Sequence, residues 1–227
     1  MIRTTKFQPV ETLEMHGISE AEFQLRVQPI MKSVFQGKHE WDVLFSPEID
    51  SKRIIFPLEI YTDLDLLRLL LEAIVEAATF VGDNGCYLSE VNQYPREYNH
   101  AYIHLSELIE GYVAPRMSRK LFFMQLDMEF SNYFMLYSEY GKWGLFSSLE
   151  YFSLLGGSNE FMKIIEHRIP DIESQTYEFL KHFRGEPRDE RDLSQGRQLI
   201  GGMLNHIYGS SKAERLLRET GWYTLNP

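Results

Sequence analysis

One stretch decides the fold class of this 227-residue chain: FSNYFMLYSEYGKWGLFSSLEYFSLLGG, residues 130–157. It contains three runs rich in aromatic and apolar residues, separated by short polar or glycine-containing segments. Strands this close together in sequence pair antiparallel, because parallel strands need a long crossover connection. We therefore predict an antiparallel sheet built on Phe130–Tyr137, Trp143–Ser147 and Tyr151–Leu155, which Gly156 and Gly157 then break.

Helical periodicity dominates on both sides of this stretch. The segment Asp63–Val81 is apolar except for a narrow charged stripe, which predicts the most buried helix of the protein. An earlier helix begins with a capping box at Ser19, and Pro29 should kink or split it. Further short strands are predicted at Trp41–Phe45, Arg53–Ile60, Cys86–Val91 and His100–Leu105. The predicted fold class is α+β, with an antiparallel β-sheet covered by several α-helices in a single main domain.

Residues after the sheet are expected to be helical, with one interruption. The charged segment Glu186–Asp192 is the best candidate for a linker. We therefore predict a main α+β domain over residues 1–185 and a C-terminal helical extension over residues 186–227 that packs on it. In this extension, Gly201 and Gly202 are expected to allow close packing against a neighbouring helix.

The charge balance restricts the partners that this protein can have. Thirty-three acidic and 23 basic residues give a formal net charge of −10. Such a surface repels phosphates on balance, so we expect no nucleic-acid partner. The same field attracts a basic protein and accelerates its association. Solubility alone is the simpler explanation of the charge, and we take it as the default.

The apolar segments and the single cysteine indicate a cytoplasmic protein. The segment Leu64–Val81 carries four charged residues, which a bilayer-spanning helix rarely tolerates, so no membrane association is expected. The first seven residues lack the apolar run of a signal peptide. Cys86 is the only cysteine, which excludes an intrachain disulfide.

The pair His100 and His104 is the most suggestive candidate for a metal site. Two histidines four residues apart share one face of a helix and could hold a transition metal. On a strand they would lie about 13 Å apart at roughly 3.3 Å per residue, which is too far for one ion. Because Tyr102, Ile103 and Leu105 favour a strand, we predict no metal ligand here.

Other candidates for catalysis are weak. Cys86 has no neighbouring base in sequence and is interpreted as a small buried apolar residue. The serine pairs at residues 147–148 and 210–211 lack the Gly-x-Ser-x-Gly pattern of a hydrolase. The segment Gly156–Ser158 lacks a phosphate-loop ending, so we interpret it as a strand-to-helix turn with Ser158 or Asn159 as N-cap. No catalytic residue and no cofactor are predicted.

A local resemblance suggests a class of protein. The sequence Gly141-Lys142-Trp143-Gly144, followed by Gly156-Gly157-Ser158 and a short helix, resembles a pattern in immunity proteins of bacterial toxin–immunity systems. It covers about 25 residues of the chain, and no functional residue is transferred from it. The resemblance implies a binding protein that neutralises a toxin domain.

Two hypotheses follow. The first is a bacterial cytosolic immunity protein that binds a basic toxin domain through an acidic and aromatic surface. Its contacts are expected at Tyr94, Glu97 and Tyr98, because aromatic residues in a polar segment have little reason to be buried. The second is an enzyme, which we favour less, with a site assembled from distant residues, such as a metal-dependent hydrolase around His100 and His104 that also involves Glu107 or Cys86.

Overall fold

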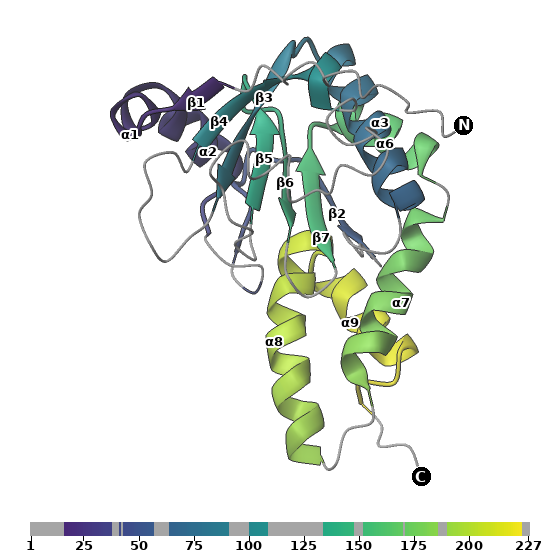
Figure 1. The fold of residues 1–227 in the computed structure, drawn as a ribbon. Helices are drawn as coiled ribbons and strands as arrows, with labels where there is room; N and C mark the ends of the chain where they lie inside the picture. Colours follow the sequence, from purple (N-terminus) through teal and green to yellow (C-terminus); the bar gives the residue numbers. More distant parts are fainter. Residues whose placement is uncertain are drawn as a thin grey trace, which may run out of the picture.

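The strands of the protein form one antiparallel sheet of seven strands in the order β1-β4-β3-β5-β6-β7-β2 (Figure 1). The computed structural model describes residues 16–37, 41, 43–56, 64–90, 100–108, 134–147, 152–169, 171–185 and 190–223. Within these ranges the strands are β1 (His16–Ile18), β2 (Ser51–Ile55), β3 (Gly85–Glu90), β4 (His100–His104), β5 (Phe134–Ser138), β6 (Trp143–Ser147) and β7 (Ser153–Gly157). The α+β class predicted from the sequence is confirmed.

The predicted three-stranded meander is the centre of this sheet. Strands β5, β6 and β7 pair antiparallel, with Met135 opposite Phe146 and Phe146 opposite Leu154. The prediction that Gly156 and Gly157 break the sheet is wrong, since both residues lie inside β7.

The glycines of the meander allow close packing on the sheet and do not end it. Gly144 and Gly156 are register partners on β6 and β7. A Cβ atom at Gly144 would lie 2.5 Å from Cζ of Phe35, and one at Gly156 would lie 2.8 Å from Cγ2 of Ile49. The two missing side chains therefore let the segment around Phe35 and Ile49 pack directly on the sheet.

Helices cover both faces of the sheet, since successive side chains of a strand point to opposite faces. Leu145 and Leu155 pack on one face with α3, α6 and Ile172 at the start of α7, whereas Phe146 and Leu154 pack on the other with residues of η1, α2, α7, α8 and α9. Figure 1 shows α3 and α6 together beside the sheet and α7, α8 and α9 extending below it. The helical segments are α1 (Glu20–Glu22), η1 (Phe23–Val27), α2 (Gln28–Val34), α3 (Leu64–Phe80), α6 (Asn159–Arg168), α7 (Ile172–Arg184), α8 (Glu190–Tyr208) and α9 (Ser210–Glu219).

The N-terminal helical segment consists of α1, η1 and α2, and η1 is a π-helix. The Ser19 hydroxyl caps its start by accepting a hydrogen bond from the Glu22 amide at 3.3 Å. Pro29 lies in the first turn of α2, where a missing amide hydrogen costs little, and the regular helix restarts there. The predicted kink or split at Pro29 takes the form of a change from π-helix to α-helix, and the segment is not interrupted, because Val27 and Gln28 keep right-handed helical backbone angles.

The strands predicted at Trp41–Phe45 and Arg53–Ile60 are shorter than expected, whereas the predicted helix Asp63–Val81 is observed. In the segment predicted as the strand Trp41–Phe45, only Phe45 pairs among the described residues, through an isolated bridge to Phe35. The strand predicted at Arg53–Ile60 is observed as β2, and residues 57–63 lie outside the described ranges. Helix α3 confirms the buried helix, and Gly82 ends it with a φ of +96°.

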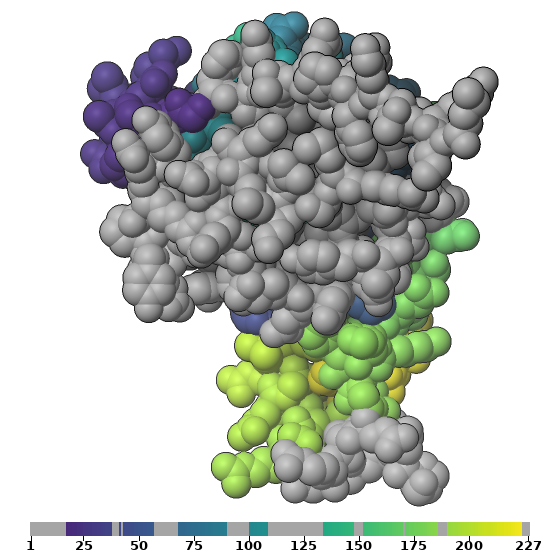
Figure 2. Space-filling view, viewed as in Figure 1, coloured from purple at the N-terminus to yellow at the C-terminus, as the bar shows by residue number. Residues whose placement is uncertain are grey.

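The C-terminal helices share the apolar cluster on the second face of the sheet. Met203 and Leu204 of α8 and Leu216 of α9 are buried in it. Arg184 donates to the carbonyl of Gly221 at 2.8 Å, which fastens the end of α9 to α7. Figure 2 shows α7 and α8 protruding below the part of the molecule that holds the sheet.

Two sequence expectations for this region are corrected, whereas the division at residue 185 stays a prediction. Helix α8 begins at Glu190, so the last three residues of the predicted linker are helical. Among the described residues, a Cβ built at Gly202 would meet no atom within 4 Å beyond its own helix backbone and chain neighbours, and one at Gly201 would lie 3.8 Å from Cδ1 of Leu217, an ordinary contact. A Cβ at Gly196 would lie 2.9 Å from the Trp222 ring. Gly196 is therefore the position of close approach. In the described part of the chain, no helix is long and apolar enough to cross a membrane.

Candidate protein-binding face

Tyrosine and histidine side chains line the second face of the sheet where β3 and β4 pair. Tyr87 lies opposite Tyr102 in this pair, and His104 follows two residues later on the same face. The Tyr87 ring lies 5.4 Å from the Tyr102 ring and 5.7 Å from the Tyr137 ring of β5, and 5.2 Å separates the rings of Tyr102 and His104. Aromatic rings from three strands thus form one continuous row.

Glu139, at the turn between β5 and β6, places a carboxylate at the end of this row. Its Oε1 accepts hydrogen bonds from the amides of Asn84 at 2.6 Å and Gly85 at 3.3 Å, and its Oε2 accepts from the Tyr102 hydroxyl at 3.1 Å. A carboxylate has about four acceptor sites. One site on Oε2 therefore stays open for another donor.

Gly85 makes this arrangement possible. A Cβ atom at residue 85 would lie 2.2 Å from the hydroxyl oxygen of Tyr102, closer than any side chain allows. The Tyr102 ring lies over the bare backbone, and its hydroxyl reaches Glu139 from there. We call Tyr87, Tyr102, Glu139 and the neighbouring Tyr140 the tyrosine patch.

A buried acid fixes the turn that carries Glu139 and Tyr140. Asp83 is 3 % exposed, and accepts from the Trp143 indole at 2.6 Å and from the Ser138 hydroxyl at 2.9 Å. The Ser138 oxygen in turn accepts from the Tyr140 amide at 3.0 Å. Burial raises the pKa of Asp83, and such an acid is a candidate for proton transfer. Because both of its oxygens are bonded inside the protein, Asp83 positions the turn and carries no chemistry.

The pKa of Tyr87 responds to burial and to groups from the neighbouring elements. Burial raises the pKa of Tyr87, Arg26 lowers it, and Glu139, Glu22 and Tyr140 raise it further. The pKa of Tyr102 is raised by burial and then by Glu139. Both hydroxyls therefore keep their protons at neutral pH. Tyr140 is 60 % exposed, so the patch presents tyrosine hydroxyls and one exposed ring to solvent.

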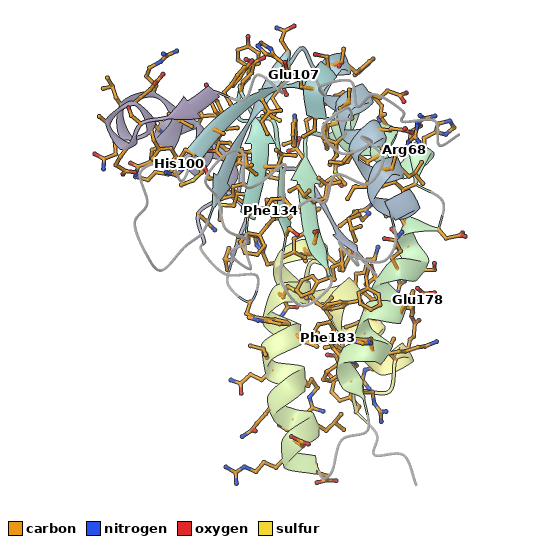
Figure 3. The ribbon with its side chains drawn as sticks, in the orientation of Figure 1. Arg68, His100, Glu107, Phe134, Glu178 and Phe183 are labelled. Carbon is orange, nitrogen blue, oxygen red and sulfur yellow. The ribbon has the colours of Figure 1, made fainter. Side chains whose placement is uncertain are left out.

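A hydroxyl, an imidazole and a carboxylate meet at the other end of the row. The Ser89 Oγ lies 2.8 Å from Nδ1 of His100 and 2.8 Å from the Tyr137 hydroxyl. Nε2 of His100 lies 3.7 Å from Oε2 of Glu20. The ring of Phe23 stacks on the imidazole, with centroids 3.4 Å apart and planes within 3°. Figure 3 shows His100 beside the N-terminal helical segment.

This order of groups is the one that a serine nucleophile needs, but its surroundings favour a structural role. A base must accept the serine proton while the hydroxyl faces substrate. Ser89 is only 2 % exposed, and Phe23 covers the imidazole. Burial lowers the pKa of His100 to about 4, against the opposing effect of Glu20, which weakens it as a base. The hydrogen bonds join the three strands β3, β4 and β5, and the Phe23 ring and the Glu20 carboxylate hold η1 and α1 against His100.

The structure locates most of the residues that the sequence singled out. The segment of His100 and His104 is a strand, as predicted, and no group of three potential metal ligands occurs in the described part of the chain. Cys86 is fully buried, and burial raises the pKa of its thiol, which makes it a poor nucleophile. Ser158 caps α6 by accepting from the Phe161 amide at 3.3 Å, as predicted.

The predicted contact residues Tyr94, Glu97 and Tyr98 lie outside the described residues, so their role stays a prediction. The tyrosine patch was missed, although a signal for it exists. On β3 and β4 the apolar residues alternate with Tyr87 and Tyr102, which indicates that these tyrosines share one face. Only the strand register shows that they meet.

No family model matches the chain, and comparisons with curated proteins and with solved structures find no match. The candidate face therefore rests on its geometry.

Proposed function

We propose that this protein is a binding protein of the cytoplasm, and specifically an immunity protein that neutralises a toxin domain by direct contact. The observation that carries the proposal is the tyrosine patch, in which a tyrosine hydroxyl donates to a carboxylate with an open acceptor site and a second tyrosine ring packs beside the first. Tyrosine is enriched among the residues that dominate binding energy at protein interfaces. Glu139 and Tyr102 are held by hydrogen bonds within the protein, so these two side chains lose little entropy when a partner binds.

Charge supports a basic partner. Residues 1–170 contain 24 of the 33 acidic side chains but only 15 of the 23 basic ones, so the part of the chain that forms the sheet carries most of the negative charge. A basic protein would be steered toward this part at low ionic strength. The toxin as partner rests further on the resemblance at residues 141–144 and 156–158.

The proposal is tested by capture and rescue. Tagged protein is incubated with lysate of the source bacterium, and a stoichiometric partner is identified by mass spectrometry. We expect a basic protein whose expression alone stops growth and whose toxicity ends when this chain is co-expressed. A captured protein that is harmless when expressed alone would contradict neutralisation, and the absence of any protein partner would contradict the binding function.

Ser89 and His100 support a second candidate, a serine hydrolase. Its test is labelling with a fluorophosphonate, which reacts with activated serines. Covalent labelling of Ser89 that is lost in His100→Ala would favour an enzyme. We expect no labelling, because Ser89 is buried.

A further inference from the structure

We propose that the tyrosine patch receives an arginine side chain of the protein partner, whose guanidinium donates to Oε2 of Glu139 and stacks on the tyrosine rings. This inference rests on the proposed function and specifies the chemistry of its interface.

The first argument is the free acceptor of Glu139. Three donors occupy the carboxylate and fix its orientation, and one site on Oε2 stays open. In the described ranges, no lysine or arginine forms an ion pair with Glu139. A guanidinium from another protein would complete this site with a charge-assisted hydrogen bond.

The second argument is the aromatic surroundings. An arginine can stack its planar guanidinium on a tyrosine ring while its N–H groups donate within the guanidinium plane, which a compact ammonium group cannot do. The protein uses this contact itself at its C-terminal end. There the guanidinium carbons of Arg197 and Arg218 lie 4.5 Å and 4.9 Å from the centroid of the Tyr223 ring. Tyr140 has an exposed ring next to Glu139, and the ammonium of Lys142 lies 5.9 Å from its centroid, so this ring already faces one cation at a distance that leaves it largely open to solvent.

The third argument is the arrangement of charges at the rim. Arg26 lies close enough to Tyr87 to affect its pKa, and it pairs with Glu22 at 3.1 Å. An incoming cation would therefore be attracted by Glu139 and Glu22 but repelled by Arg26 and by Lys142, whose ammonium lies 5.9 Å from the centroid of the Tyr140 ring. Removal of Arg26 should strengthen binding, because it removes part of the repulsion and frees Glu22. This expected sign is opposite to that of every change at Glu139.

The test uses the full chain with labelled tyrosine rings. An acetylated, amidated peptide with two arginines among glycines is titrated in while the ring signals are followed by NMR. We expect saturable shifts at Tyr87, Tyr102 and Tyr140, and none with the same peptide containing neutral citrulline. Citrulline that binds as well as arginine would overturn the proposal, because charge would then be irrelevant.

Matched variants sharpen this test. Glu139→Gln should weaken the peptide at least about tenfold, the range of a charge-assisted hydrogen bond. Arg26→Gln should tighten it about twofold to fivefold, as expected for a partly screened charge. Glu178→Gln makes the same charge change on α7 (Figure 3) and should leave the affinity unchanged. Equal effects of the Glu139 and Glu178 changes, or weaker binding by Arg26→Gln, would refute the site.

Folding and function are controlled separately. If Glu139→Gln does not fold, Tyr140→Ser replaces it, because this exposed side chain is not needed for packing, and it should also weaken the peptide. The captured protein partner is then measured with the same variants. A partner that binds Glu139→Gln as tightly as wild type contradicts the arginine site but leaves the proposed function intact. Binding of the arginine peptide without any protein partner contradicts the function and supports the site.

Discussion

Replacement of Asp83 by alanine should cost about 3 kcal/mol of folding free energy. The change leaves two buried donors without an acceptor, the indole N–H of Trp143 and the hydroxyl of Ser138. Both residues are 0 % exposed, so water cannot replace the lost bonds without opening the structure. An unsatisfied buried donor costs about 1–3 kcal/mol, which gives roughly 2–6 kcal/mol for two. The substitution also removes the free-energy cost of burying the Asp83 carboxylate, and this gain offsets part of the loss.

Two variants calibrate this value. Asp83→Asn keeps an oxygen for the indole, and its amide can donate to the Ser138 oxygen, so we expect a loss of about 1 kcal/mol. Asp50→Ala removes an exposed carboxylate and should stay within about 0.5 kcal/mol of wild type. The assay is urea denaturation at pH 7 followed by far-UV circular dichroism, with the slopes compared to check that the unfolded states match.

A double-mutant cycle isolates the bond itself. Trp143→Phe is measured alone and together with Asp83→Ala. Because the bond involves a charged acceptor, we expect a coupling energy of about 1.5–3 kcal/mol. If the effects of the two substitutions add within about 0.5 kcal/mol, the reasoning is refuted. It is also refuted if the Asp83→Ala variant has the same urea midpoint of unfolding as the wild type.

Further changes test the packing of the sheet and its response to acid. Gly144→Ala places a Cβ 2.5 Å from the Phe35 ring and should destabilise by about 1–3 kcal/mol. Among the described residues, a Cβ at Gly202 meets no atom within 4 Å beyond its own helix backbone and chain neighbours, so Gly202→Ala should stabilise by up to about 1 kcal/mol in thermal melts. Equal effects would show that the glycines are not packing positions. His206 accepts from the Phe45 amide at 2.9 Å, and burial lowers its pKa to about 4. Its folded pKa lies below the unfolded value of about 6.5, so stability is full above pH 6.5 and is lost as the pH falls toward 4. His206→Gln, which keeps an acceptor, should reduce the slope of unfolding free energy against pH in this window, and an unchanged slope would contradict the assignment.

Local patterning alone determined the fold class and the main elements of this protein. The aromatic runs of residues 130–157 predicted the meander, because strands joined by short connections can pair only antiparallel. The apolar periodicity of residues 63–81 predicted α3, and the segment of His100 and His104 was predicted correctly as a strand. These features depend on residues that are close together in the chain, so the sequence pattern is sufficient to predict them.

Tertiary structure decided the order of the strands, the role of the glycines and the candidate face. Strand β2 pairs at the far edge with β7, although α3 and four strands separate them along the chain. The sequence placed Gly144 in a predicted strand and Gly156 in a predicted turn, and only the approach of Phe35 and Ile49 shows that both are packing positions.

The tyrosine patch depends in the same way on contacts between distant residues. Glu139 accepts from the amide of Asn84, 55 residues earlier, and from the Tyr102 hydroxyl. Neither the open acceptor on Glu139 nor the ring contact between Tyr87 and Tyr102 is encoded in any local pattern. Strand register and side-chain packing minimise the free energy of the whole chain, and they bring together residues whose separation in sequence carries no information about their separation in space.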